Sequence, residues 1–380
     1  MKSVLLNEIC ELIVDCPHST AVNEGKGYPL VRTPNIGKGR LVYSGMHRVS
    51  EEVYHKRNLR AIPQEDDLIF AREATAGNVA LIQKGEKVCL GQRTVLIRPN
   101  KSIVNPAFLT YLLLAPKQQY NLLSTANGAT VAHVNLPTIR NLKLELPDSS
   151  IQHRIATILS RYDSLIENYQ KQIKLLEESA QRLYKEWFID LRFPGHENTK
   201  IVDGVPEGWE KTILCSLVEF KRGKTITKKD VIEGNIPVVA GGLEPAYYCN
   251  KFNTSERVIT ISASGANAGY TKMYFKKVWA SDCSFADNSM TPYLHFIFCF
   301  LRDNKTTIDN MQKGSAQPHV YAKDVNAMEL CLPETSILQT FEKKVSKRFD
   351  TISSLLSQIR HLTEARDRLL PKLMSGEIDE

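Results

Sequence analysis

The feature that most constrains the fold of this chain is a segment that occurs twice at a fixed separation. The sequence "GATVAHV" at 128–134 is related to "GSAQPHV" at 314–320. Aligning His133 with His319 gives a shift of 186 positions, which is 319 minus 133. Such a period is far longer than the roughly 20 to 50 residues of solenoid repeats, so each copy can be a domain with its own core.

The rest of the chain follows the same shift. The matching pairs, of which the third needs a slip of one residue, are "LELP" at 144–147 with "LCLP" at 330–333, "QIKLLEE" at 172–178 with "QIRHLTE" at 358–364, and "SRYDSLI" at 160–166 with "KRFDTIS" at 347–353. The chain is therefore a degenerate two-fold repeat.

The bulk composition is that of a globular protein. With 380 residues, of which 42% are hydrophobic, the chain should form two or more domains, and its net charge of +7 permits a polyanionic partner without requiring one. The eight cysteines form no CxxC pair, which argues against a zinc site. Since no stretch approaches 18 uninterrupted apolar residues, we expect a cytoplasmic protein without a membrane partner.

A long helix is predicted after Pro147. Residues 148–188 contain no glycine or proline, and Ser149 with Gln152 resembles a capping box. Apolar residues recur at steps of three and four, with one stutter, which indicates a coiled-coil helix about 60 Å long.

The second copy predicts a matching helix after Pro333. Ser336 and Gln339 stand in the same capping positions, and we expect Pro371 to end or kink the last turn. Two such apolar stripes most simply pair with each other in antiparallel fashion, although each helix could instead pack on its own domain. The residues expected to pack between the helices are Ile155, Ile158, Tyr162, Leu165, Tyr169, Ile173, Leu176, Leu183, Phe349, Ile352, Leu356, Ile359 and Leu369.

The remaining sequence predicts two mixed α/β domains, so the fold class is α+β. Short β-rich segments such as "DDLIFA" and "RVITIS" alternate with turn residues, and a Pro/Gly-rich stretch interrupts the chain after the first helix. The expected boundaries are 1–147 for the first domain, 148–191 for the first helix, 192–204 for a linker, 205–333 for the second domain and 334–380 for the second helix.

Catalytic motifs are not convincing. The "GKT" at 223–225 resembles the end of a phosphate-binding loop, but Val218 stands where the first glycine should be. The nine histidines form no HExxH motif, and the chain has no Asp/Asn-Pro-Pro-aromatic tetrapeptide of adenine methyltransferases. We therefore expect no catalytic residues, no metal site and no cofactor in this chain.

Basic and polar loops suggest a nucleic-acid surface instead. The segment "KRGKTITKK" at 221–229 has five basic residues and no acid, and polar loops follow apolar strands at 71–81 and 262–273. A solvated basic loop and ordinary turn polarity are the alternatives. The candidate DNA-binding residues are Arg72, Thr75, Asn78, Lys221, Arg222, Lys224, Lys228, Lys229, Ser264, Asn267, Lys272 and Gln317.

This layout resembles the specificity subunit of type I restriction-modification systems. The resemblance is carried by "NGATVAHVNLPTIRNLKLELP" and "KGSAQPHVYAKDVNAMELCLP", by the long helices after Pro147 and Pro333, and by "VPEGWEKTILCSLVEFKRGK". The first loop diverges, with Thr130, Val131 and Ala132 where the second has Ala316, Gln317 and Pro318.

The resemblance implies a non-catalytic DNA-targeting subunit. Each mixed domain would be a target recognition domain that reads one half of a bipartite site in double-stranded DNA, and the helices would be spacers. Two methyltransferase subunits would bring S-adenosylmethionine for adenine methylation, and restriction subunits would bring ATP, Mg and DNA cleavage. The alternatives are a stand-alone DNA-modifying enzyme and a coiled-coil assembly scaffold without a DNA role.

Overall fold

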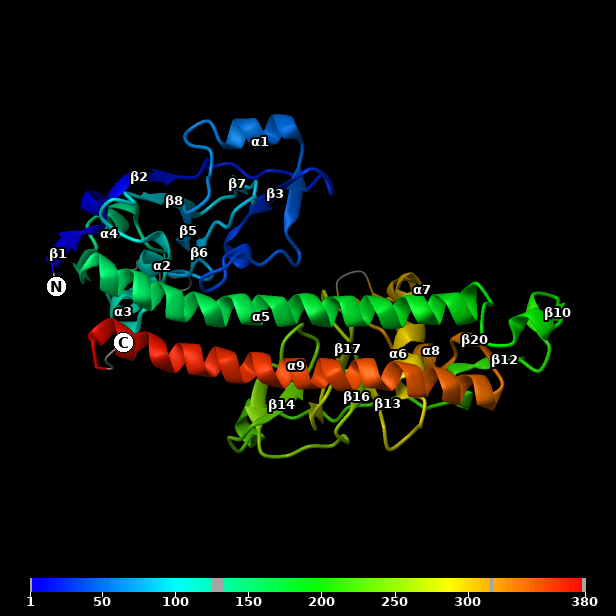
Figure 1. The fold of residues 1–380 in the computed structure, drawn as a ribbon. Coiled ribbons are helices and arrows are strands. Elements are labelled where there is room, and N and C mark those ends of the chain that lie inside the picture. Colours follow the sequence, from blue (N-terminus) through cyan, green and yellow to red (C-terminus); the bar gives the residue numbers. More distant parts are fainter. Residues whose placement is uncertain (1, 125–132, 315–316, 378–380) are drawn as a thin grey trace. The chain divides into compact units, whose positions relative to one another are not determined.

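The computed structural model describes residues 2–124, 133–314 and 317–377 (Figure 1). It contains two compact units: unit 1 comprises residues 1–169 and 358–380, and unit 2 comprises residues 170–357. Each unit therefore contains one mixed domain together with a stretch of both long helices.

The domain of unit 1 is built on two small sheets and a closing strand pair. The four-stranded sheet has the order β2 (Cys10–Asp15), β8 (Thr94–Pro99), β5 (Leu68–Ala71), β6 (Val79–Leu81). The three-stranded sheet has the order β4 (His47–Val49), β3 (Tyr28–Val31), β7 (Cys89–Leu90), and β1 (Lys2–Leu5) pairs with β9 (Lys143–Leu146). The helices are α1 (Glu51–Arg57), α2 (Pro106–Leu114), α3 (Pro116–Leu123) and α4 (Leu136–Arg140).

The domain of unit 2 has the same plan. Its four-stranded sheet has the order β13 (Lys221–Arg222), β19 (Cys283–Asp287), β16 (Val258–Ser262), β17 (Thr271–Tyr274). The three-stranded sheet is β15 (Tyr247–Cys249), β14 (Ile236–Val239), β18 (Trp279–Ala280), and β12 (Glu210–Ile213) pairs with β20 (Glu329–Leu332). A hairpin of β10 (Ile201–Val202) and β11 (Val205–Pro206) precedes it, and the helices are α6 (Leu294–Asp303), α7 (Lys305–Asn310) and α8 (Ala322–Asn326).

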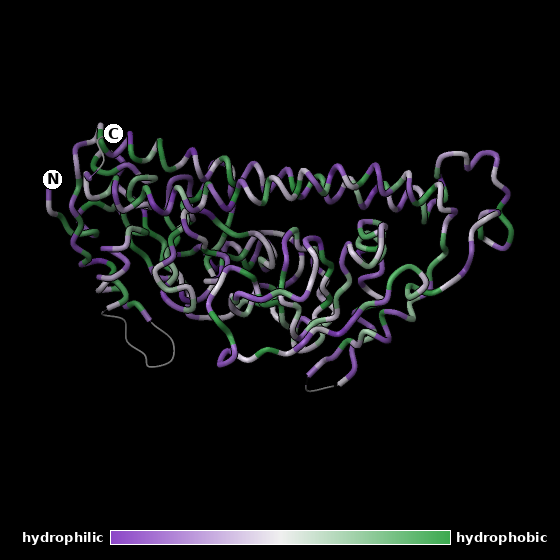
Figure 2. The backbone as a smooth tube through the Cα atoms, turned by 90° about the horizontal axis from the view of Figure 1, so that it is seen from below, coloured by the Kyte–Doolittle hydropathy of each residue, from purple (hydrophilic) through white to green (hydrophobic). Residues whose placement is uncertain are grey.

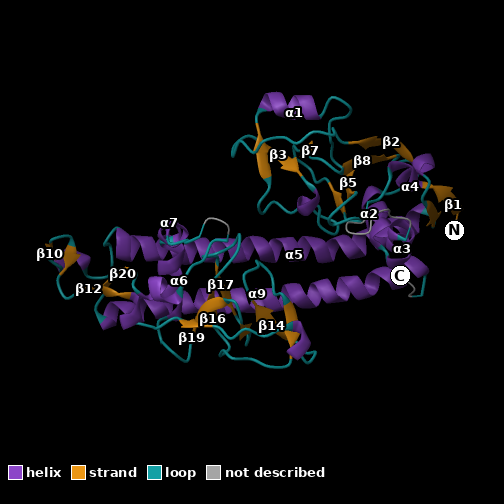
Figure 3. Ribbon diagram, turned by 180° about the vertical axis from the view of Figure 1, so that it is seen from behind, coloured by secondary structure: helices purple, strands orange, loops and turns teal. Residues whose placement is uncertain are grey.

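The agreement between the two sheet orders confirms the predicted internal repeat and the α+β class. Figure 3 shows that the strands of both domains are short and that long loops connect them. In each unit the first and last strands of the domain pair with each other, so the chain enters and leaves each domain at one place.

The two long helices are α5 (Ser149–Tyr184), which continues into the π-helical turn η3 (Lys185–Ile189), and α9 (Thr335–Ser375). They lie antiparallel in both units. In unit 1 the Arg366 guanidinium pairs with Asp163, and in unit 2 Arg348 donates from Nε to Ser179 Oγ over 3.1 Å. Hydrophilic and hydrophobic residues alternate along both helices in Figure 2, as the predicted periodicity requires.

Of the residues expected to pack between the helices, Ile155, Phe349 and Ile352 are buried, and most of the others are half-buried. The prediction is wrong for Leu165 and Leu356, because these residues are 38% and 43% exposed. Leu355 is buried next to Leu356, so the actual stripe is offset by one residue at that point.

Two predictions about helix ends need correction. Gln152 forms no capping box with Ser149: its Oε1 accepts from the Asn105 backbone amide over 2.9 Å, and its Nε2 donates to the Pro147 carbonyl over 3.0 Å. Of the two effects predicted for Pro371, ending the helix is wrong, because α9 continues to Ser375, whereas a kink in the last turn stays a prediction.

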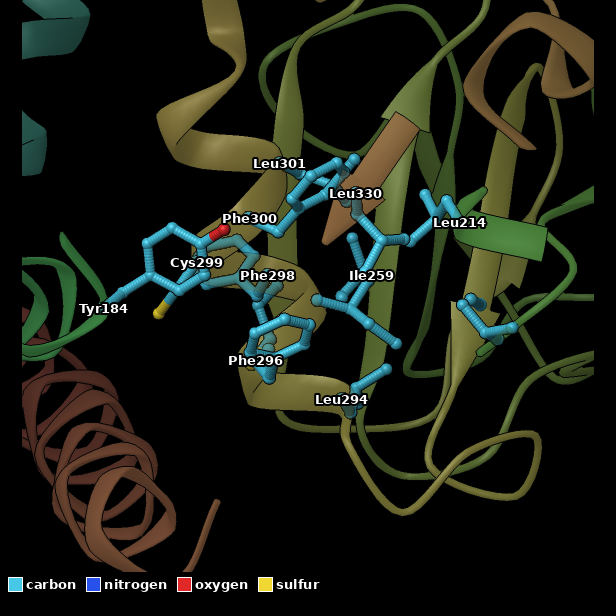
Figure 4. Close-up of a cluster of buried hydrophobic side chains, with 14 of the residues drawn as sticks. Tyr184, Leu214, Ile259, Leu294, Phe296, Phe298, Cys299, Phe300, Leu301 and Leu330 are labelled. Carbon is cyan, nitrogen blue, oxygen red and sulfur yellow. The ribbon is translucent and has the colours of Figure 1, made fainter. Parts of the chain in front are cut away.

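Unit 2 has an aromatic core between its domain and its helices. Figure 4 shows Tyr184 from α5 facing the α6 residues Phe296, Phe298 and Cys299. Tyr184 lies 5.6 Å from the ring of Phe296, and Phe341 of α9 lies 6.1 Å from the same ring. The domain is thus joined to both helices by buried apolar surface.

None of the helices in the described ranges 2–124, 133–314 and 317–377 combines the length and the hydrophobicity that a membrane-spanning helix requires.

Candidate nucleic-acid interface

The described ends of the repeated loops, residues 133–134 and 317–320, occupy the same place in both domains. In unit 1 the Val134 amide donates to the Arg72 carbonyl, and in unit 2 the Val320 amide donates to the Ala263 carbonyl, each over 3.0 Å. Each hydrogen bond fixes the repeated loop against the residue that follows the inner strand β5 or β16. The end of each four-stranded sheet is therefore the common location of the candidate residues.

In unit 2 the repeated loop pairs with the loop that follows β16. The Gly265 amide donates to the Pro318 carbonyl over 3.0 Å, and Ser264 and His319 form an isolated antiparallel bridge. Gln317 precedes this contact and is exposed. Its neighbours Ser315 and Ala316, like Thr130, Val131 and Ala132 of the first loop, lie outside the described residues.

Two candidates from distant parts of the sequence meet at this loop. The Arg222 guanidinium donates to Asp282 Oδ1 over 2.6 Å, and the Ser264 hydroxyl donates to Asp282 Oδ2. Asp282 was absent from the predicted set, yet it orients both side chains.

Asn267 and Lys272 both lie against a neighbouring loop. Asn267 Nδ2 is 3.5 Å from the Gly241 carbonyl, and Lys272 Nζ donates to the Leu243 carbonyl over 3.2 Å. Lys272 also lies 3.6 Å from the Glu244 carboxylate. These two side chains therefore support the loop at 241–244.

The basic segment of unit 2 is accessible. Lys221, Lys224, Lys228 and Lys229 are all exposed, the last two in the short 3-10 turn η6 (Lys228–Asp230). They line the chain from β13 onward, and their part in DNA binding stays a prediction.

The glycine of "GKT" has a structural role. Its amide donates to the Cys283 carbonyl over 2.8 Å, and a Cβ there would lie 2.4 Å from the Ser281 carbonyl oxygen. Gly223 is thus required by a close approach of backbone. The Lys224 amide is also used, by the Ala280 carbonyl at 2.9 Å, so these two amides are not directed at a phosphate.

An aromatic and basic cluster beside the repeated loop was missed. The Tyr321 ring is 38% exposed and stacks on His319 at a centroid distance of 6.0 Å. Lys313 Nζ and Lys323 Nζ each lie 5.9 Å from that ring. The interleaving of Lys313, His319, Tyr321 and Lys323 along the sequence was a usable signal, because stacking rings and cations suit nucleic acid.

In unit 1 the equivalent position is closed by ion pairs. Arg72 is buried: its Nη1 donates to Asp15 over 2.7 Å, its Nε donates to the Val134 carbonyl over 3.0 Å, and its Nη2 lies 2.9 Å from His133. His133 in turn contacts the Glu73 carboxylate at 2.6 Å. Arg72 therefore holds the repeated loop and does not present a free guanidinium to a base edge.

Thr75 and Asn78 also have partners inside unit 1. The Thr75 hydroxyl donates to the Thr33 carbonyl over 2.8 Å, and Asn78 Nδ2 donates to the Ile36 carbonyl over 2.9 Å. Both side chains fix the loop before residue 37.

Comparison of these contacts shows that two equivalent positions carry side chains of opposite charge in the two units. Strand registers place Asp15 opposite Val95 in unit 1 and Arg222 opposite Ser284 in unit 2. The Arg72 amide bonds the Arg93 carbonyl, and the Ala263 amide bonds the Asp282 carbonyl. Asp15 and Arg93 thus correspond to Arg222 and Asp282, so the two sites share a scaffold and differ in charge.

No group of three or more metal-ligating side chains occurs among the residues that the structure describes. Burial raises the pKa of the Cys283 thiol, next to the candidate site, to about 12. That thiol is therefore protonated at neutral pH and is a poor nucleophile.

Comparison with known proteins gives one family. The model of the type I restriction modification DNA specificity domain matches residues 1–178 and again residues 206–364. The two matches coincide with the two copies of the repeat.

Individual relatives agree with that match. The chain is 27% identical to the type I restriction enzyme MjaIX specificity subunit of Methanocaldococcus jannaschii, over 98% of this chain and 92% of the relative. It is 24% identical to the type I restriction enzyme HindI specificity subunit of Haemophilus influenzae, over 75% of this chain and 80% of the relative. The crystal structure of the type I restriction-modification S subunit from M. genitalium has a similar fold, with a TM-score of 0.56 at 17% identity, covering 98% of this chain and 95% of that one.

Proposed function

Because this chain belongs to the type I restriction-modification DNA specificity family, we propose that it is a DNA-targeting subunit whose two domains each read one half of a bipartite site. The observation that carries the proposal is the duplicated domain with one scaffold and two different sets of side chains at the repeated loop. A shared scaffold meets the duplex in the same manner twice, while different side chains select different bases.

The repeat suits the symmetry of its target. Duplex DNA has approximate two-fold axes, and proteins with two-fold related readers bind two half-sites on it. Because Asp15 and Arg93 of unit 1 correspond to Arg222 and Asp282 of unit 2, the two half-sites should differ in sequence.

The basic side chains supply binding that is independent of sequence. Lys221, Lys224, Lys228 and Lys229 are exposed, which supports a role in phosphate contacts. Each phosphate that is neutralised releases counterions and lowers the slope of log affinity against log salt by about 0.9. The basic segment therefore holds the domain on DNA, while the loops at 264–267 and 317–321 contact base edges.

Catalysis belongs to partner subunits in this proposal. Two methyltransferase subunits bring S-adenosylmethionine and methylate adenine, and restriction subunits bring ATP and Mg and cleave DNA. The relatives are named as specificity subunits of restriction enzymes, which supports this division of labour. No cofactor is assigned to this chain.

The test is to exchange one domain at a time. Since β1 pairs with β9 through Ser3 and Glu145, residues 1–147 can be replaced as one unit by the domain of another family member. The exchange also replaces the domain's contacts with α5, among them the hydrogen bond of Tyr111 to Asp163. Sequencing of methylated adenines, after co-expression with the methyltransferase, should show one half-site changed and the other retained. Exchange of residues 205–333, bounded by the β12–β20 pair, is the matched experiment. A chimaera that changes both half-sites, or neither, would overturn the proposal.

The alternative function, a stand-alone DNA-modifying enzyme, is tested with the purified chain. The purified chain, incubated with DNA and either S-adenosylmethionine or Mg, should leave the DNA unmodified. Turnover by the chain alone would contradict a targeting role.

A further inference from the structure

Four side chains of unit 2 form a chain of polar contacts that joins its domain to α9 at two points. They are Glu342, His295, Arg257 and Asp350. His295, in the first turn of α6, contacts Glu342 of α9 with Nδ1 to Oε1 at 2.5 Å. On the other side of the ring, Nε2 lies 3.4 Å from Arg257 Nη1, and Arg257 Nη2 pairs with Asp350 of α9. Glu342 and Asp350, at the two ends of this chain of contacts, therefore belong to α9, and the two residues between them belong to the domain.

Both ring nitrogens of His295 have partners. The Glu342 carboxylate faces Nδ1 and the Arg257 guanidinium faces Nε2. The ring also stacks on Phe349 of α9, at a centroid distance of 4.6 Å and an interplanar angle of 21°. The two ring nitrogens and one face of the imidazole are thus contacted by separate groups.

Glu342 also holds the beginning of α6. Its two carboxylate oxygens accept from the backbone amides of His295 over 3.2 Å and Phe296 over 3.1 Å. A carboxylate at a helix N-terminus is favoured by the helix dipole and satisfies amides that lack partners within the helix. Since α6 packs in the core of the domain, a rotation of α6 would move the whole domain.

Unit 1 attaches its equivalent helix with different residues. Gln152 of α5 accepts from the backbone of Asn105, the N-cap of α2, and the Tyr111 hydroxyl donates to Asp163 over 2.6 Å. Asp163 and Asp350 are matched aspartates of "SRYDSLI" and "KRFDTIS". At the position of His295, however, the first copy has Leu109. The attachment is thus present in both units although its chemistry differs, which indicates that the attachment itself is required.

We propose that Glu342, His295, Arg257 and Asp350 are positioning residues that hold the second recognition domain in one orientation on α9 and so restrict the gap between half-sites that the protein accepts. The inference rests on the proposed reading of a bipartite site. Two anchors eight residues apart (350 minus 342), about 12 Å along the helix, resist both tilt and twist. If they are weakened, the domain samples more orientations, and sites with a wrong gap become acceptable while the bases read remain the same.

The test measures selectivity for the gap. The native gap is first taken from the methylated sites of the wild-type complex with its methyltransferase. DNA duplexes with the same half-sites, and with gaps shorter or longer by one or two base pairs, are then methylated by wild type, His295→Leu, Arg257→Ala and Glu342→Gln. We expect the preference for the native gap over its neighbours to fall by about tenfold, the effect of losing one charge-assisted hydrogen bond, with the half-site sequences unchanged.

Asp309→Asn is the matched control. Asp309 pairs with Lys305 on the surface of the same unit, on α7, and its removal should leave gap selectivity as in wild type. If the variants of buried residues fail to fold, gap selectivity is measured in Asp350→Asn instead. The Asp350 side chain is 56% exposed, so this variant should fold, and its gap selectivity should be reduced.

The outcomes are distinct. Wild-type gap selectivity in every folded variant would overturn the inference, and so would a change in the bases recognised. Failure of the wild-type complex to methylate any bipartite site would instead overturn the proposed function from which the inference starts.

Discussion

At the scale of single residues, the arginines near the two repeated loops have different surroundings. Arg72 is buried in unit 1 between Asp15 and His133, whereas Arg222 of unit 2 is exposed and contacts Asp282. The former stabilises a loop, and the latter is available to a phosphate or a base.

Substitution of these two arginines should therefore have different effects. Arg72→Ala removes the guanidinium that pairs with Asp15, whose side chain is only 14% exposed, and should cost about 3 kcal/mol in the free energy of unfolding. Arg222→Ala should change stability by less than about 0.5 kcal/mol, because that pair is half-exposed. Urea titration measures the first effect. DNA binding at several salt concentrations should show weaker affinity for Arg222→Ala and a slope reduced by about one. Equal stability loss in both variants would contradict the assignment.

Asp163 is a second residue whose removal should be costly. Its side chain is 3% exposed and accepts from both Arg366 and Tyr111. Burial and the adjacent carboxylate raise the pKa of Tyr111, so its hydroxyl remains a donor. Asp163→Asn should lower the free energy of unfolding by about 3 kcal/mol. Asp309→Asn, which breaks an exposed pair, should lower it by less than about 0.5 kcal/mol. A difference of less than 1 kcal/mol between the two would argue against this role for Asp163.

Two thiols with raised pKa values, the half-buried Cys10 and the buried Cys283, predict a dependence of stability on pH. Burial raises the pKa of Cys10 and of Cys283 to about 12 from an ordinary value of 9.0. Above pH 9 the unfolded chain loses these protons and the folded chain keeps them, so stability should fall as pH rises from 9 toward 12. Urea titration under reducing conditions at pH 8 and pH 10 measures the fall. It should be smaller in Cys283→Ala, and an identical fall would show that this thiol contributes nothing.

At the scale of elements, the long helices were predictable because their signal is local. Residues 148–188 lack glycine and proline and have a helical apolar period, which is sufficient to predict α5. The site was less predictable because its contacts are not local. Thr75, Asn78 and Arg72 are polar loop residues in the sequence, and only folding shows that they bond to residues 33, 36 and 15.

The error at Leu356 has the same origin. Period alone does not distinguish two adjacent leucines, and in the structure Leu355 is buried whereas Leu356 is exposed. We expect Ile352→Ala to cost about 3 kcal/mol, because Ile352 is 1% exposed. Leu356→Ala should cost less than about 1 kcal/mol. Thermal unfolding of both variants checks the register, and a larger effect at Leu356 would show that the stripe had been placed incorrectly.

At the scale of the whole molecule, the DNA specificity domain of type I restriction modification systems occurs twice in one chain, with the same sheet orders. The first and last strands of each domain pair with each other, so a domain can be replaced while its stretch of helix is retained. Two readers on one chain, each with its own loop chemistry, suit a target in two unequal parts.

The central claim is tested most directly in a host that expresses this chain together with its methyltransferase. The measurement is the sequencing of methylated adenines in the DNA of that host. The account predicts methylation at a two-part site with two different half-sites and a fixed gap, and loss of that methylation when this chain is deleted. Methylation that persists without the chain, or that follows a single continuous site, would contradict it.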